Sequence, residues 1–236
     1  MQEIKLVLET STERGVVAVF DKEDCLFQEQ LPFGIQNSHL LLPVLQKKMN
    51  QHSLKFKAIS FVAVGLGPGS YTGIRVGAMI AKSLAFTLMI PLVGVCTLDA
   101  FIPKNEGVFA VVIDAKIGGV YLQIGCLQNG TVESMVLPQA CSLSEAINLL
   151  GDVPTIVTPN AEKIRPKLEM LNPQAKWDWQ QRYPEPQQLL RTAQFKLNKG
   201  IVPDDQHLEL LYMRKTQAEI EKEQDKQDPK RQDRQD

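Results

Sequence analysis

Residues 59–88 constrain the fold of this chain more than any other stretch. They begin with a run of β-branched and apolar residues, 59–64, which is typical of a buried strand. A loop rich in glycine follows, and it leaves its backbone open to close approach by another chain or a ligand. From Ile74 the sequence is apolar or small on nearly every side, which predicts a helix buried on more than one face. With Arg75 and Lys82 inside it and fewer than about 18 apolar residues, this helix is too charged and too short to span a bilayer.

The order of strand, glycine loop and helix is shared by two nucleotide-binding motifs, but the spacing excludes both. A dinucleotide motif G-x-G-x-x-G that starts at Gly65 would need a third glycine where Ser70 stands. A phosphate-binding loop G-x-x-x-x-G-K-[ST] would need a lysine after the last glycine, and the first lysine is Lys82. Two interpretations remain: a tight turn that lets the helix pack close to the sheet, or a loop that another molecule approaches.

The composition is that of an ordinary soluble globular protein. The 236 residues are enough for one large domain or two small ones, with 44% hydrophobic and 22% charged residues. The formal net charge of −1 gives no net attraction to RNA or to an anionic membrane, so a role on nucleic acid would need a partner with a basic surface. The cysteines are widely spaced and form no C-x-x-C pair, which predicts core residues in a reducing compartment. Without an apolar signal core near Glu3, we expect a cytoplasmic protein that makes no membrane contact.

The chain contains two similar segments. Residues 4–8 and 16–20 predict a β-hairpin, followed by a strand over 26–31 and a helix over 39–51 with Pro43 near its start. Near mid-chain, VVIDAKIGGVYLQIG repeats the plan of LVLETSTERGVVAVF and aligns Glu9 with Asp114. This repeat predicts a duplicated fold.

The later part of the chain contains weaker signals. Ser142 and Glu145 have the spacing of a capping box that begins a helix. We expect a strand over 155–158 and helices over 162–171, interrupted by Pro166, and 187–198. Residues 217–236 are almost all charged or Gln, which predicts a disordered tail.

Few residues are candidates for chemistry. Glu9 and Asp114 follow buried strands, where they could hold Mg²⁺ beside a nucleotide phosphate or bond to local backbone N–H groups; we favour the second role. Ser70 lies in Gly67-Pro68-Gly69-Ser70, which lacks the spacing of a nucleophile elbow. The histidines do not pair at helical spacing, so we expect no catalytic residue and no metal site; they are His39, His52 and His207.

The helices predicted over 39–51 and 74–88 have more apolar surface than a domain of this size needs for its own core. An excess apolar patch on a soluble protein usually marks a partner interface.

The glycine loop also carries a family resemblance. GLGPGSYTGIRVG closely resembles the GPGSFTGLRIG signature of the bacterial TsaB (YeaZ) family, with Tyr71 in place of Phe and Ile74 in place of Leu. LVLETST is similar to the family's LAIDTST, NSHLLLPVLQ to its H-S-x-x-L-L-P helix, and GVCTLDAF to its GVSTLxAL. VVIDAKIGGVY is similar to IDARxxEVY and LYMR to YLR, so the resemblance extends in order from Leu6 to Arg214.

The resemblance implies the α/β ASKHA fold of actin, Hsp70 and sugar kinases, in which two duplicated lobes each have a mixed sheet flanked by helices. The lobes would comprise residues 1–103 and 104–216, followed by the tail 217–236. In this fold the hairpin acids face the phosphates of ATP, and the family usually has Asp where this chain has Glu9, which weakens the case for a strict metal geometry. The residues that would frame a vestigial or shared nucleotide cleft are Glu9, Thr10, Ser11, Gly67, Gly69, Ser70, Thr72, Gly73 and Asp114.

The resemblance further implies an accessory subunit without catalysis of its own. It would bind TsaD and, with the ATPase TsaE, support threonylcarbamoyl transfer to the tRNA adenosine beside the anticodon, with TsaC supplying the threonylcarbamoyl-adenylate. The chain would meet tRNA only through that complex, would hold no cofactor tightly, and would share ATP or ADP with Mg²⁺ at an interface. The histidine pair by which TsaD binds its metal is absent from this sequence. The partner surface, through which a homodimer would also form, would include Leu41, Leu45, Arg75, Val76, Ile80 and Leu84.

Two other functions stay open from the sequence. One is an active small ASKHA ATPase or kinase that uses Glu9 and Asp114. The other is a peptidase, for which the chain shows neither a catalytic triad nor metal-ligand spacing.

Overall fold

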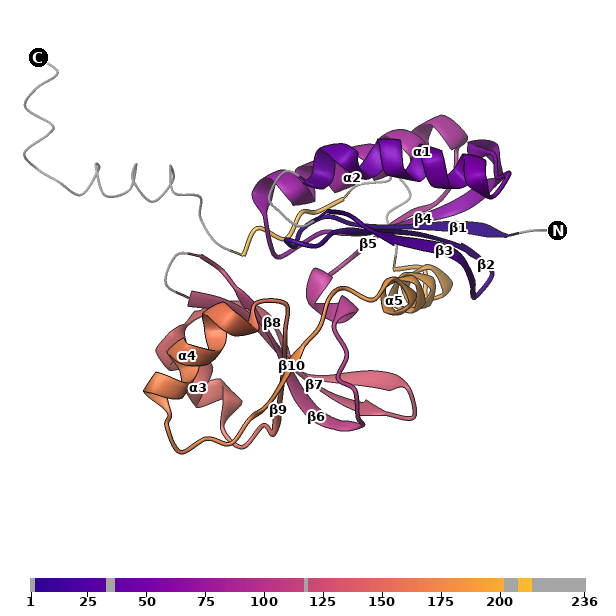
Figure 1. Cartoon of the computed structure of the whole chain (residues 1–236). Coiled ribbons are helices and arrows are strands. Elements are labelled where there is room, and N and C mark those ends of the chain that lie inside the picture. Colours follow the sequence, from indigo (N-terminus) through magenta and orange to yellow (C-terminus); the bar gives the residue numbers. More distant parts are fainter. Residues whose placement is uncertain (1–2, 33–36, 117–118, 202–207, 214–236) are drawn as a thin grey trace, which may run out of the picture.

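The computed structural model describes residues 3–32, 37–116, 119–201 and 208–213, and it contains two five-stranded sheets (Figure 1). The first sheet has the strand order β3-β2-β1-β4-β5. The second, read from its β8 edge, has the matching order β8-β7-β6-β9-β10. The strands of the first sheet are β1 (Ile4–Glu9), β2 (Val16–Asp21), β3 (Asp24–Gln30), β4 (Ile59–Gly65) and β5 (Leu92–Val95). The strands of the second sheet are β6 (Gly107–Asp114), β7 (Gly119–Gln128), β8 (Thr131–Ser142), β9 (Thr155–Thr158) and β10 (Asp178–Gln181).

The strand directions also match between the sheets. β1 pairs antiparallel with β2 and parallel with β4, and β6 pairs antiparallel with β7 and parallel with β9. Equal order and equal direction over ten strands confirm the predicted duplicated α/β fold with two lobes, each built on a mixed sheet. The predicted tail, residues 217–236, lies outside the described residues.

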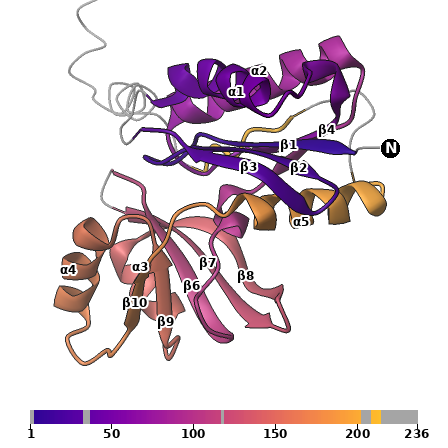
Figure 2. The same ribbon diagram turned by 45° about the vertical axis from the view of Figure 1, so that its right-hand side comes forward.

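Five α-helices cover the sheets in the described part of the chain. α1 (Leu41–Gln51) and α2 (Tyr71–Leu88) lie side by side on one face of the first sheet, and α5 (Pro186–Asn198) lies on its opposite face (Figures 1 and 2). α3 (Leu143–Leu150) and α4 (Ala161–Leu171) lie together on one face of the second sheet. α5 follows the second sheet in sequence but packs on the first, so it connects the two lobes.

The alternation of side chains along β1 explains how the first sheet uses both faces. Ile4, Leu6 and Leu8 point into the core under α1 and α2, whereas Val7 joins the core on the side of α5 and the second lobe. Successive side chains of a strand point to opposite faces, so Glu9 shares the face of Val7. The short 3₁₀ helix η3 (Thr97–Ala100) packs on that side with Val7, and it lies between the first and the second sheet in sequence.

The helix ends follow local chemistry. Ser70 caps α2 by accepting a hydrogen bond from the backbone N–H of Gly73, and Ser142 and Glu145 form the predicted capping box of α3. Pro43 lies in the first turn of α1, where a missing N–H removes no bond within the helix. Contrary to prediction, α4 continues through Pro166, because the buried Ile164 and Leu168 hold both halves against the second sheet. None of the helices in the described ranges combines the length and hydropathy that crossing a bilayer requires.

Candidate functional site

The turn after β1 and the glycine loop after β4 pack tightly against each other. β1 and β4 are parallel neighbours, so the residues that follow them meet at the same edge of the sheet. A Cβ atom at Gly69 would overlap the carbonyl oxygen of Ser11, and one at Gly73 would overlap that of Thr10. The Thr10 hydroxyl donates a hydrogen bond of 2.7 Å to the carbonyl oxygen of Gly73. The close approach that these glycines allow is therefore used by the protein's own backbone.

Glu9 lies in the centre of this arrangement and is fully buried. Its carboxylate accepts hydrogen bonds from the Ser11 backbone N–H and hydroxyl, both at 2.5 Å, and from the Thr97 hydroxyl at 2.7 Å. Gly65 leaves the room that this side chain needs, because a Cβ atom there would overlap Glu9 Oε2. The carboxylate is thus enclosed by its own turn and by η3, as in the local role that the sequence favours.

Burial raises the pKa of Glu9 above its ordinary value of 4.5, and the hydrogen bonds from Ser11 and Thr97 oppose that rise. An acid whose pKa is higher in the folded state stabilises the fold at low pH and loses that contribution as the pH rises through the folded pKa. We therefore expect the free energy of unfolding of the wild type, minus that of Glu9→Gln, to fall between about pH 5 and about pH 8. Urea unfolding at both pH values measures this difference. A difference that stays constant or grows with pH would contradict the assignment.

Asp114 lies at the end of β6 in the second lobe and makes its contacts there. Its carboxylate accepts a hydrogen bond of 3.2 Å from the Lys116 backbone N–H and lies 3.8 Å from Lys167 Nζ. The structure thus brings Glu9, Thr10 and Ser11 together with the glycine loop, and it places Asp114 among residues of the other lobe.

Side chains of the protein also bridge the two lobes beside these hairpins. Lys163 Nζ of α4 lies 2.9 Å from Glu13 Oε1 in the β1–β2 turn, and this hydrogen bond raises the pKa of Lys163. The Arg14 guanidinium lies 4.5 Å from the centre of the Tyr183 ring. In the part of the chain that the structure describes, no three His, Cys, Asp or Glu side chains gather as metal ligands.

The second candidate site is the outer surface of α1 and α2. Leu41 and Leu45 are fully buried in the core between α1 and the first sheet, which removes them from the predicted partner surface. Their helical spacing predicts that they share one apolar face of the helix, but only the fold shows that this face packs on the sheet. Val76, Ile80 and Leu84 are half-buried.

Arg75 is exposed and donates a hydrogen bond of 2.9 Å to the Tyr212 hydroxyl, whose ring stacks on Tyr71. Tyr212 belongs to residues 208–213, which return to the first lobe through a backbone hydrogen bond from Leu211 to Leu66.

The exposed large apolar side chains of α2 and its C-cap were missed by the sequence reasoning. Met79, Phe86 and Met89 are 68%, 77% and 90% exposed. The signal was present in the small residues that recur every four positions and form the buried face of α2: Gly73, Gly77, Ala81 and Ala85. A stripe of small residues identifies the face packed on the sheet, so Met79 and Phe86 on the opposite side of the helix face outward, and Met89 follows them at the C-cap. We call Met79, Phe86 and Met89 the α2 surface.

Comparison with known families adds to this geometry. The model of the TsaD family, described as tRNA N6-adenosine threonylcarbamoyltransferase, matches residues 35–181. Proteins named "tRNA threonylcarbamoyladenosine biosynthesis protein TsaB" are similar: that of Bacillus subtilis is 29% identical over 62% of this chain and 66% of its own length. Those of Haemophilus influenzae and Escherichia coli are 30% and 31% identical, over 61% and 49% of this chain and 66% and 52% of their own lengths. The chain thus spans between half and two thirds of the length of these relatives.

Two solved structures from Pseudomonas aeruginosa have the same fold. An uncharacterized protein described as similar to the peptidase YEAZ superimposes with a TM-score of 0.76 at 21% identity, over 90% of this chain and all of its own. YeaZ superimposes with a TM-score of 0.70 at 22% identity, over 85% of this chain and 94% of its own. Both confirm the predicted two-lobed fold.

Proposed function

Since this chain belongs to the TsaD-like family of that model, and within it to the TsaB (YeaZ) proteins, we propose that it is a non-catalytic accessory subunit that binds TsaD. It takes part in tRNA threonylcarbamoyladenosine biosynthesis, as the names of its relatives state for those proteins. In this proposal TsaE joins the complex, and the chain works in the cytoplasm.

The contacts of Glu9 and of the β1–β2 turn support the absence of catalysis. In an ATPase of this fold, the hairpin acids must reach nucleotide phosphates or their Mg²⁺. Here Glu9 is enclosed by Ser11 and Thr97, and the Lys163–Glu13 ion pair joins the lobes beside the turn. A nucleotide with Mg²⁺ would accordingly bind at an interface shared with TsaD.

The α2 surface is the observation that carries the proposal. Phe86 and Met79 project from a long helix whose opposite face is fully packed, and Lys82 lies exposed between them. Exposed apolar side chains grouped on one helix face are typical of a protein interface, and buried aromatic residues supply much of the binding energy in such contacts. We propose that TsaD covers this surface and that a second copy of the chain covers it when TsaD is absent.

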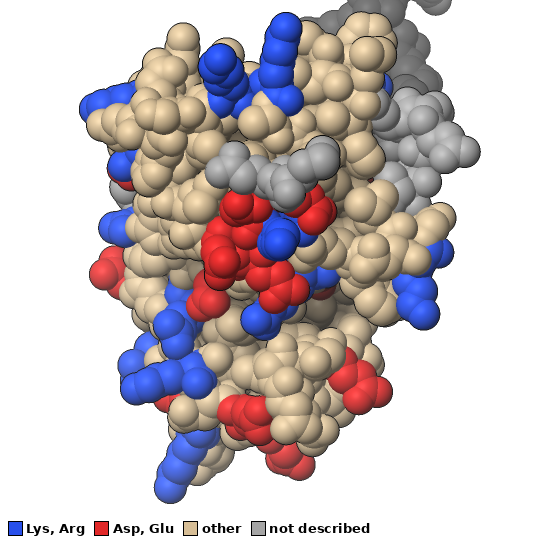
Figure 3. Space-filling model, turned by 90° about the vertical axis from the view of Figure 1, so that its right-hand side faces the viewer, with Lys and Arg blue, Asp and Glu red and all other residues tan. Residues whose placement is uncertain are grey.

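The charge distribution supports contact with tRNA through the complex only. The formal net charge is −1. On the face shown in Figure 3, acidic side chains gather near the centre, with Lys and Arg beside and around them. That face offers no continuous basic surface to the phosphate backbone of RNA.

The proposal is tested by mixing the purified chain with TsaD of the same organism and measuring complex mass by light scattering and affinity by calorimetry. We expect a heterodimer that forms at the expense of self-association. A chain that leaves the mass of TsaD unchanged would overturn the proposal.

A further inference from the structure

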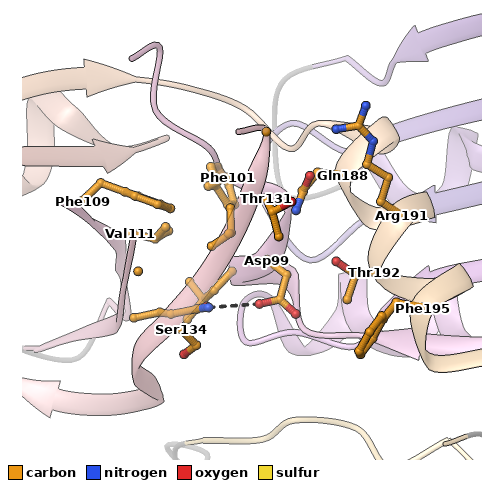
Figure 4. A pocket seen from close by; sticks show the side chains of 15 residues that line it. Asp99, Phe101, Phe109, Val111, Thr131, Ser134, Gln188, Arg191, Thr192 and Phe195 are labelled. Atoms are coloured by element: carbon orange, nitrogen blue, oxygen red, sulfur yellow. Dashed lines mark hydrogen bonds between the residues drawn. The ribbon is translucent and has the colours of Figure 1, made fainter. Parts of the chain in front are cut away.

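A cavity of about 430 Å³ lies between α5 and the face of the second sheet that α3 and α4 leave free (Figure 4). α5 supplies one wall, and β6, β7 and β8 supply the other. The cavity is lined by neither Glu9 and the residues that bond to it nor the α2 surface, and the proposed function uses none of its residues.

β7 contributes both a polar and a glycine position to the cavity wall. Every second residue of a strand lies on the same face of the sheet, so Tyr121, Gln123 and Gly125 share one face. Gly125 lines the cavity without a side chain, and Val132 of β8 and the Phe109 ring lie close to its Cα. A pocket of this size, in which apolar and aromatic walls are combined with polar groups, has the character of a small-molecule site.

Two polar side chains of the cavity, Asp99 and Gln123, present hydrogen-bond acceptors to it, and the other polar lining residues carry donor groups: Thr131, Ser134, Gln188, Arg191 and Thr192. Asp99 of η3 accepts a hydrogen bond of 3.1 Å from Gln123 Nε2, drawn as the dashed line in Figure 4. Gln123 is 5% exposed, and its Oε1 atom has no hydrogen-bond partner among the described residues. Burial raises the pKa of Asp99 above its ordinary value, and the hydrogen bond from Gln123 and the charge of Lys196 oppose that rise. A molecule that donates hydrogen bonds would satisfy the buried Gln123 Oε1 and the partly buried Asp99 carboxylate.

The nearby cations do not complete it. Lys196 affects Asp99 through its charge, but its ammonium donates a hydrogen bond of 3.0 Å to the Gly94 carbonyl oxygen. Arg191 lines the cavity from α5 and is exposed, and in Figure 4 its guanidinium points away from Asp99. The carboxylate therefore faces the cavity without a directly bonded positive group among the described residues.

Aromatic rings line the same cavity as this carboxylate. Phe101, Phe109 and Phe195 line the cavity, and Val111 adds to the apolar wall. The faces of aromatic rings attract organic cations, and a flat apolar body buries area against them. We propose that the cavity binds a small organic amine, whose amino group donates to Asp99 and whose flat apolar body lies among the phenylalanine rings.

The test uses a series of aromatic amines of increasing size, benzylamine, phenethylamine and tryptamine, with indole-3-propionate as the acidic counterpart of tryptamine. Binding to the full chain is followed by NMR, through the side-chain amide resonances of Gln123. We expect at least one amine to shift these resonances saturably and indole-3-propionate to leave them unchanged.

Two variants identify the site. Asp99→Asn keeps the hydrogen bond with Gln123 but removes the charge, and we expect it to weaken amine binding by about tenfold or more. Thr192→Trp, which fills the cavity from α5, should abolish binding. Asp152→Asn, an exposed acid outside the cavity, serves as the control and should change nothing. The proposal is overturned if no amine in the series binds, or if Asp99→Asn and Thr192→Trp both leave binding unchanged.

Discussion

Replacing Phe86 with glutamate is expected to weaken binding to TsaD by about 100-fold or more while the protein stays folded. Phe86 is 77% exposed, so its replacement leaves the core under α2 intact. In the complex, the new carboxylate would be buried in an apolar contact without a partner, which costs several kcal/mol. Met79→Glu, in the middle of the same helix, should have the same effect, and both should reduce self-association.

The control is Met170→Glu, because Met170 on α4 is 75% exposed and undergoes the same chemical change as Met79 on the other lobe. We expect it to bind TsaD like the wild type. Affinity is measured by calorimetry, and circular dichroism verifies the fold of each variant. Equal losses in Met79→Glu and Met170→Glu would show that charge in general, and not the α2 surface, governs binding.

Replacing Gly73 with valine is expected to destabilise the protein by about 3 kcal/mol or more. Its Cβ atom would overlap the carbonyl oxygen of Thr10, which is backbone and cannot move without displacing the end of β1. Thermal unfolding followed by circular dichroism should show a fall in Tm of roughly 5 °C or more for a chain of this size.

Ser83→Val is the matched control, because Ser83 is an exposed residue of the same helix and the change adds the same β-branched side chain without an overlap. We expect Ser83→Val to lower the free energy of unfolding by well under about 1 kcal/mol, because only helix propensity changes. If both variants unfold at the same temperature, the tight packing of the glycine loop on the β1–β2 turn does not hold.

The sequence predicts the parts of this fold that local chemistry determines. Strands β1, β4 and β6 are apolar runs buried on both faces, and such runs can be recognised without knowing their neighbours. The capping box of Ser142 and Glu145 is local in the same way. The repeat of the β1–β2 segment in β6–β7 predicts the duplicated sheet order, because similar segments fold alike.

What the sequence does not predict depends on contacts between distant segments. Leu41 and Met79 are both apolar, but Leu41 is buried against the first sheet and Met79 is exposed. The enclosure of Glu9 depends on Thr97, 88 residues further along the chain. The cavity at Asp99 exists because α5 returns to the first sheet and leaves one face of the second sheet uncovered, which no local pattern encodes.

The most direct test of the account is to reconstitute tRNA modification from purified components. TsaC, TsaD and TsaE of the same organism are incubated with threonine, bicarbonate, ATP and tRNA, with and without this chain, and threonylcarbamoyladenosine is measured by mass spectrometry. The account predicts modified tRNA with the wild-type chain and with Met170→Glu, and little or none without the chain or with Phe86→Glu. Full modification in the absence of the chain would contradict its role as an accessory subunit.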